Sequence, residues 1–226
     1  MPVRTGYRIP ISLNPDGTTV SNVRNKTLAD YASPTRTWTV TSGSVTSQGT
    51  NDGTWGQTLP TCFQLAPSTK VSSALLLSSG VFTLMMRIRI PTLASGTEMR
   101  TDAIFTNGGT RYFQLGYRYT PTDPENPVHS FEITEVASGT VTITTGVAAN
   151  TWYHLAIVNN GLRFNTYVNG GSGPPLTLGE VAPWNTSSSF GLETENAEVL
   201  QLTDFVFLKK ELSAKEIGNY AAAPFI

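Results

Sequence analysis

The C-terminal third of the chain decides its fold, because four short motifs follow one another there. They are Trp152-Tyr-His-Leu-Ala-Ile-Val158, Tyr167-Val-Asn-Gly170, Asp204-Phe-Val-Phe-Leu208 and Leu212-Ser-Ala-Lys-Glu-Ile217. The first two predict strands separated by a turn that contains glycine, and the third predicts another strand. The fourth predicts the start of a short helix, because Ser213 and Glu216 can form a capping box between the apolar Leu212 and Ile217.

The order of these motifs resembles the end of a concanavalin A-like domain of the laminin-G type. In that family a strand that opens with tryptophan precedes a Tyr-Val-Asn-Gly hairpin, and a late Asp-Phe strand leads into Leu-Ser-x-x-Glu-Ile. The resemblance covers roughly residues 70–222. It implies a jelly roll that acts as a binding module rather than as an enzyme.

Alternating apolar residues predict strands in the middle of the chain without that resemblance. In residues 82–90 one face carries Phe82, Leu84, Met86, Ile88 and Ile90. The other face carries Arg87 and Arg89, which predicts a half-buried strand. Residues 112–119 alternate in the same way and place together Phe113, Leu115, Tyr117 and Tyr119.

Further turns and strands complete an all-β pattern. Ser138-Gly139 predicts a hairpin turn between two short apolar segments, 131–133 and 141–143. Residues 41–60 are rich in Thr, Ser, Gly and Asn and predict a long exposed loop or hairpin. We therefore expect a two-sheet antiparallel jelly-roll sandwich, concanavalin A-like, with a short C-terminal helix.

This jelly-roll (laminin-G-like) domain is expected to span residues 26–226, and residues 1–25 are expected to form an N-terminal arm or edge segment. Three prolines and Asp16-Gly17 break regular structure in the segment. Ile9, Ile11 and Leu13 can still form a brief strand. Such a segment gains more by adding to a neighbour's surface or sheet edge, so we expect it to contact other virion subunits.

Composition excludes several classes of partner and compartment. The net charge of −1 argues against nucleic-acid binding, and no apolar run is long enough to span a membrane. Cys62 is the single cysteine and is expected to be a small core residue. The N-terminus lacks the apolar centre of a signal peptide. These features favour assembly in the host cytoplasm into a virion.

Glycoside hydrolases share the jelly-roll fold, so the carboxylates are candidate catalytic residues. Glu193 and Glu195 have an alternate spacing but lack a third acid and flanking apolar strand residues, whereas Glu132 and Glu135 would face opposite sides of a strand. His154 and the other histidine, His129, are expected to be structural. No Gly-x-Ser-x-Gly elbow is present. We therefore expect no catalytic residues.

A calcium site is the open alternative to an absence of cofactors, because calcium is common in this fold family. Asp123 and Glu125 in the proline-rich loop, or Asp102, carry oxygen ligands of the kind that calcium prefers. No loop has the dense Asp and Asn spacing of a dedicated site. We expect no metal-ligating residues.

Glycan binding needs an aromatic platform beside polar side chains at a loop rim. The candidate ligand-binding residues with that composition are Trp55, Tyr117, Arg118, Trp184 and Asn185. The alternative is that the tryptophans cap the ends of the sheets or fill an interface with another subunit, because aromatic residues are also enriched in protein–protein interfaces.

Two functions remain after these exclusions. The first is a non-catalytic structural or adhesive protein of a virus particle, a bacteriophage capsid decoration or tail component that presents a lectin-like jelly roll to a host-surface glycan. The second is a soluble carbohydrate-binding module or a remnant glycoside hydrolase. A complete acidic triad would have favoured the second, and the sequence contains none.

Overall fold

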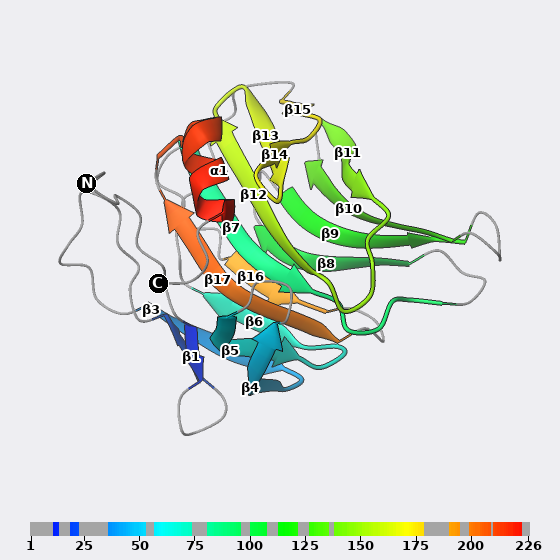
Figure 1. Ribbon diagram of the computed structural model, residues 1–226, viewed down its shortest axis with the longest axis vertical. Coiled ribbons are helices and arrows are strands. Elements are labelled where there is room, and N and C mark those ends of the chain that lie inside the picture. Colours follow the sequence, from blue (N-terminus) through cyan, green and yellow to red (C-terminus); the bar gives the residue numbers. More distant parts are fainter. Residues whose placement is uncertain are drawn as a thin grey trace.

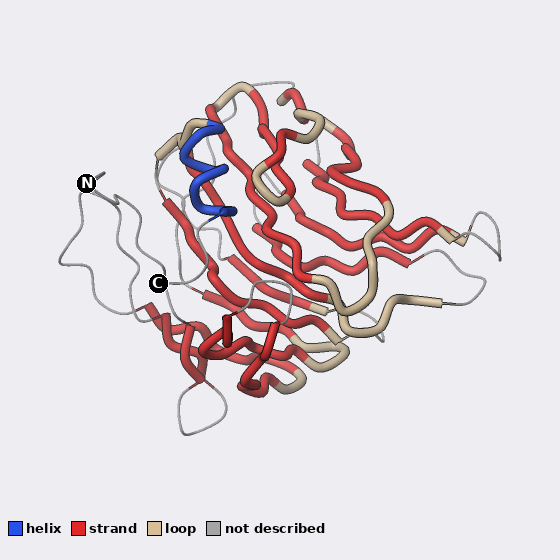
Figure 2. The backbone as a smooth tube through the Cα atoms, viewed as in Figure 1, coloured by secondary structure: helices blue, strands red, loops and turns tan. Residues whose placement is uncertain are grey.

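The chain folds into two antiparallel β-sheets that stack face to face, with one helix on the outer face of one sheet (Figures 1 and 2). The computed structural model describes residues 11–13, 19–22, 36–52, 57–73, 81–95, 100–107, 113–121, 127–135, 138–178, 190–194, 199–208 and 210–222. This architecture confirms the predicted jelly-roll sandwich with a short C-terminal helix.

The first sheet has nine strands. In spatial order they are β1 (Ile11–Leu13), β2 (Thr19–Asn22), β3 (Arg36–Ser42), β6 (Lys70–Ser73), β16 (Phe190–Glu193), β8 (Arg100–Asn107), β9 (Phe113–Thr120), β10 (Val128–Glu135) and β11 (Gly139–Thr145). The second sheet has eight strands. In order they are β14 (Gly171–Ser172), β13 (Arg163–Val168), β12 (Trp152–Asn160), β7 (Val81–Arg89), β17 (Leu200–Leu208), β5 (Gln57–Leu65) and β4 (Val45–Asp52), with β15 (Leu176–Thr177) also paired to β13.

Aromatic side chains from both sheets meet in the core between them. Phe82 of β7 stacks on Phe113 of β9 with ring centroids 5.6 Å apart, and Phe164 of β13 lies 5.3 Å from Phe113. All three side chains are fully buried. The alternation predicted for residues 82–90 and 112–119 is therefore confirmed on the core side, where apolar burial drives the packing.

The outer face of β7 departs from the prediction of a half-buried strand. Met85 and Arg87 are only 1% and 2% exposed. The helix α1 (Ala214–Ala222) covers this face (Figure 1) and forms a second apolar cluster with it. Its buried members are Met85, Ala156, Val158, Tyr167, Leu208, Leu212 and Ile217. Because the cover comes from a segment 125 or more positions away, the local pattern of β7 did not reveal it.

The start of α1 has the predicted capping box. The Ser213 backbone N–H donates to Glu216 Oε2 at 2.8 Å, and the Glu216 backbone N–H donates to Ser213 Oγ at 3.3 Å. Leu212 and Ile217 are both buried and form the apolar contact on either side of the cap. The helix continues through Gly218 and ends at Ala222, so this glycine does not stop it.

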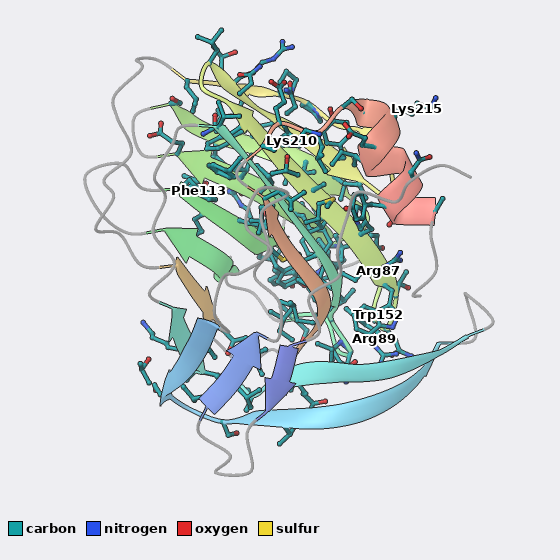
Figure 3. The ribbon with its side chains drawn as sticks, turned by 90° about the vertical axis from the view of Figure 1, so that its left-hand side faces the viewer. Arg87, Arg89, Phe113, Trp152, Lys210 and Lys215 are labelled. Carbon is teal, nitrogen blue, oxygen red and sulfur yellow. The ribbon has the colours of Figure 1, made fainter. Side chains whose placement is uncertain are left out.

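The far end of α1 is held by an arginine of the sheet below it. Arg87 Nη2 donates to the carbonyl oxygen of Ala221 at 3.1 Å, where a positive charge also complements the helix dipole. Two positions further along β7, Arg89 lies 5.0 Å above the ring of Trp152 and donates to Gln201 Oε1 at 2.6 Å. Figure 3 shows Arg87, Trp152 and Arg89 in succession away from the helix.

Gly170 explains how closely the helix can approach the β13–β14 turn. Its φ of +85° is unfavourable for other residues. A Cβ at this position would lie 3.1 Å from the Cβ of Ala221 and 3.3 Å from the Cα of Gly218. The glycine of the Tyr-Val-Asn-Gly motif is therefore required both for the turn and for helix docking.

The chain passes between the sheets at a set of threonine hydrogen bonds. The Thr69 backbone N–H donates to Thr194 Oγ1 at 3.0 Å, and the Thr194 backbone N–H donates to the carbonyl of Thr69 at 2.9 Å. Thr69 Oγ1 also accepts a hydrogen bond from the Ser44 N–H at 3.1 Å. These bonds, here called the Thr69–Thr194 contact, join three turns that lie far apart in the sequence.

The N-terminal segment contributes strands to the chain's own sheet. The predicted brief strand is present as β1, and β2 pairs with β3 through Val20 opposite Trp38. The other residues of the segment lie outside the described part of the chain. Residues 41–60 contain most of the β4–β5 hairpin, which confirms the hairpin alternative for this region. The Ser138-Gly139 turn joins β10 to β11 as predicted.

Candidate functional site

Of the five residues predicted to bind a ligand, the structure describes two, Tyr117 and Arg118. Trp55, Trp184 and Asn185 lie outside the described residues. Tyr117 is 1% exposed and belongs to the core, so its assignment to a binding rim is wrong. Its hydroxyl accepts a hydrogen bond from the Ala94 N–H at 3.2 Å and lies 2.7 Å from His129 Nδ1.

Arg118 lies on the opposite, outward face of β9. Its Nη1 atom lies 3.4 Å from both carboxylate oxygens of Glu132 on β10. The side chain of Arg118 is 34% exposed, whereas that of Glu132 is 9% exposed. Arg118 is therefore the solvent-accessible partner of this ion pair, and Glu132 is the buried partner that holds its guanidinium group in place.

Two hydroxyl groups also point at Glu132. Thr142 Oγ1 of β11 lies 3.4 Å from its Oε1, and Ser130 Oγ lies 3.5 Å from the same atom. We call Arg118, Ser130, Glu132 and Thr142 the Glu132 patch. It spans three neighbouring strands on the outer face of the nine-stranded sheet.

Strand register and one glycine assemble this patch. Glu132 is paired with Gly116 on one side and with Thr142 on the other, and Arg118 is paired with Ser130. Because Gly116 has no side chain, Arg118 can reach diagonally to Glu132, a distance that long side chains span. Sequence reasoning missed Ser130, Glu132 and Thr142 as partners, because the proline-rich loop between β9 and β10 hides the register.

The arrangement can hold polar hydroxyl groups but does not form a catalytic carboxylate pair on β10. Glu132 faces outward, whereas Glu135 is fully buried and lies three positions away, on the opposite face of the strand. The two carboxyl groups therefore do not flank one bond, as glycoside hydrolysis requires. The side chain of Glu193 and all of Glu195 lie outside the described part.

The two histidines occupy structural positions. Burial lowers the pKa of His129 from its ordinary value, and its ring stacks on Tyr119 at 5.2 Å. His154 is 4% exposed beneath α1. Burial first, and then the positive charge of Arg87, lowers the pKa of His154 to about 3. His154 is therefore neutral at ordinary pH, and its burial agrees with the expected structural role.

The described side chains include no group of three or more His, Cys, Asp and Glu residues that could hold a metal ion. The calcium candidates Asp123 and Glu125 lie outside the described residues, as does the side chain of Asp102. None of the helices in the described part is long and apolar enough to cross a membrane.

The family of the chain is shown by its sequence. Residues 66–218 match a laminin G-type model of the concanavalin A-like lectin/glucanases superfamily, and the chain belongs to this superfamily. The matched range agrees with the resemblance over residues 70–222. The comparison with curated proteins gives no match.

Solved structures with this fold include binding domains of clostridial toxins. The binding domain of botulinum neurotoxin serotype G has a TM-score of 0.63 at 14% identity, and that of Paraclostridial Mosquitocidal Protein 1 has 0.61 at 13%. A botulinum neurotoxin type C structure, described with cell entry that depends on two ganglioside molecules, has 0.59 at 15%. Each match covers 94% of this chain but only 50%, 51% and 50% of the other.

Proposed function

We propose that this chain is a non-catalytic, lectin-like domain that binds a glycan through the Glu132 patch. The observation that carries this proposal is the ion pair of Arg118 and Glu132 on an outward sheet face, beside two hydroxyl groups. A guanidinium group presents several donors in a fixed plane. Such a plane suits neighbouring sugar hydroxyls, which accept and donate hydrogen bonds in pairs.

Substitutions in the patch test glycan binding. We expect Arg118→Ala and Glu132→Gln each to weaken binding by about tenfold or more, the loss expected for hydrogen bonds to charged groups. Binding is measured on an oligosaccharide array and then by calorimetry, with Lys215→Ala on the exposed side of α1 as the control. Binding that survives both patch substitutions contradicts the proposal. Ganglioside headgroups are included as one probe, because the structure of botulinum neurotoxin type C is described with two ganglioside molecules. They are only one probe among others, because that protein shares only the fold with this chain, over half of its own length.

The enzyme alternative is tested on the same protein. We expect no release of reducing sugar from laminarin, agarose or alginate, because Glu132 and Glu135 lie on opposite faces of β10. Turnover that disappears in Glu132→Gln, or in Glu193→Gln or Glu195→Gln, would instead favour a glycoside hydrolase.

We further propose that the domain is a component of a virus particle, as a phage capsid decoration or tail protein. The supports are the near-zero net charge, the single Cys62 and the low content of charged residues, 14%. Mass spectrometry and immunogold labelling of purified particles test this role. Protein that occurs free in the medium, and not on particles, would favour the soluble carbohydrate-binding module.

A further inference from the structure

The strand β11 forms one edge of the nine-stranded sheet and lies at the upper right in Figure 1. Among the described strands only β10 pairs with it. The carbonyl of Glu135 accepts from the Ser138 N–H, and the carbonyl of His129 accepts from the Val147 N–H. The odd-numbered residues of β10 therefore direct their backbone groups toward the β11 side.

Backbone direction alternates along a strand, so the register fixes which groups of β11 point outward. Val141 is paired with Ile133 and faces β10. The N–H and C=O groups of Thr140 and Thr142 consequently point away from the sheet. Both threonines are exposed, so this edge presents a ladder that another strand can continue.

This edge lacks the charges and prolines that often protect a sheet edge. No Asp, Glu, Lys, Arg or Pro occurs in residues 136–162, although charges and prolines are the usual means of blocking edge pairing. Among the other described edge strands, β1 has 3 residues, and β14 and β15 have 2 each. The edge strand β4 is longer, with 8 residues, but a register shift between Gln48 and Thr50 interrupts it and it ends at Asp52. β11 has 7 residues. A register shift between Phe131 and Glu132 leaves Gly139–Thr142 as its regular part.

We propose that the β11 strands of two copies of this chain pair antiparallel about a two-fold axis at Val141. In this register Thr140 of each copy lies opposite Thr142 of the other, so every outward backbone group of these residues finds a partner. A second copy fits this edge because self-pairing places like residues together. The edge has no charge to repel its own copy, and Thr–Thr and Val–Val pairs stabilise antiparallel strands.

The contact also brings two Glu132 patches together. β10 of one copy and β10 of the other lie three strand spacings apart, about 14 Å. Both patches lie on the same face of the joined sheet, because opposite residues of an antiparallel pair share a face. Pairing therefore produces a two-site surface, and it uses a part of the chain that is distinct from residues 1–25.

Sedimentation equilibrium over a wide concentration range tests the proposal with the full chain. We expect a reversible dimer that Thr142→Pro weakens by about tenfold or more, because the proline removes an outward N–H from both copies. Thr142→Val is the matched control, since it keeps the N–H and the β-branched shape but loses the hydroxyl that contacts Glu132. We expect it to weaken the dimer far less than Thr142→Pro does, because only the side-chain hydroxyl is lost and the backbone pairing is kept.

A second pair of variants does not depend on proline. Thr140→Lys places one lysine on each side of the axis, on diagonally neighbouring positions, and is expected to weaken the dimer by repulsion. Thr177→Lys, at an exposed threonine of β15 in the other sheet, is not expected to do so. Val141→Cys in a Cys62→Ala background should form a disulfide-linked dimer on mild oxidation. A chain that stays monomeric at all concentrations overturns the proposal. A dimer whose stability is unchanged by Thr142→Pro and by Thr140→Lys also overturns it. A dimer that forms no disulfide through Val141→Cys shows that the two-fold axis does not lie at Val141.

Discussion

Ser213 is the N-cap residue that starts the helix α1. Its hydroxyl accepts the Glu216 N–H, and its N–H, together with its hydroxyl, lowers the pKa of Glu216. We expect Ser213→Ala to reduce the free energy of unfolding by about 1 kcal/mol, the usual contribution of an N-cap. Urea unfolding measures the change, and Ser172→Ala, at an exposed position of β14, is the control. Equal stability of both variants would mean that the cap contributes nothing.

His154 makes stability depend on pH. Its folded pKa of about 3 lies below the ordinary 6.5, so the unfolded chain binds this proton first as the pH falls. Its contribution is complete above pH 6.5 and is lost progressively down to about pH 3, with a slope of up to about 1.4 kcal/mol per pH unit. We expect His154→Gln to make the midpoint of urea unfolding depend less on pH between about pH 5 and 6.5. An unchanged slope contradicts this assignment.

At the scale of single residues, the sequence predicted core positions better than surface partners. The alternation around Tyr117 placed it with Phe113 and Leu115, and all three are buried. Its aromatic character nevertheless favoured a binding rim, which was wrong. The partner of Arg118 could not be predicted, because the contact to Glu132 depends on the register across a loop and on the gap left by Gly116.

At the scale of elements, α1 owes its stability to docking rather than to its length. Ile217 is fully buried against the outer face of β7 and β12. We expect Ile217→Ala to lower the free energy of unfolding by about 2–5 kcal/mol, the range for deleting a buried aliphatic group. Lys215→Ala, on the exposed side of the same helix, should change it by less than about 0.5 kcal/mol. Similar losses in both variants would contradict docking through this face.

The elements also show why a correct strand assignment can give a wrong environment. The alternation in residues 82–90 located β7 correctly, and Phe82 and Leu84 face the core as predicted. The charge of Arg87 indicated solvent, yet this side chain is buried and holds the end of α1. Local alternation defines two faces of a strand, but a distant segment determines what covers each face.

At the scale of the whole molecule, the N-terminal segment can be tested by truncation. Removing residues 1–20 deletes β1 and part of β2, so β3 becomes the edge of the sheet. We expect a folded, β-rich protein by circular dichroism, with a melting temperature lowered by a few degrees, about 2–4 °C per kcal/mol lost. If the segment also contacts a neighbouring subunit, the truncated chain will fail to join the particle. If the truncated chain joins the particle normally, the N-terminal segment contributes only to the chain's own sheet.

Most of the architecture followed from motifs in the second half of the chain. The Trp152 strand, the Tyr167 hairpin and the Ser213 cap occur where the sequence placed them. The first 70 residues carry weaker periodicity, and of their strands only β1 and the β4–β5 hairpin were predicted. The order of the strands in the sheets was not predicted. That order depends on pairings such as β6 with β16, which join residues more than a hundred positions apart.

The Thr69–Thr194 contact is expected to form late when this protein folds. It joins residues 125 apart in the sequence, and the loop between them must close before any of its hydrogen bonds can form. Sheets built from such distant pairings fold in about milliseconds to seconds. We expect Thr194→Val to accelerate unfolding and to leave the refolding rate nearly unchanged in stopped-flow experiments, because a contact that closes so long a loop is expected to form after the rate-limiting step. The last pairing to form would then be the first to open.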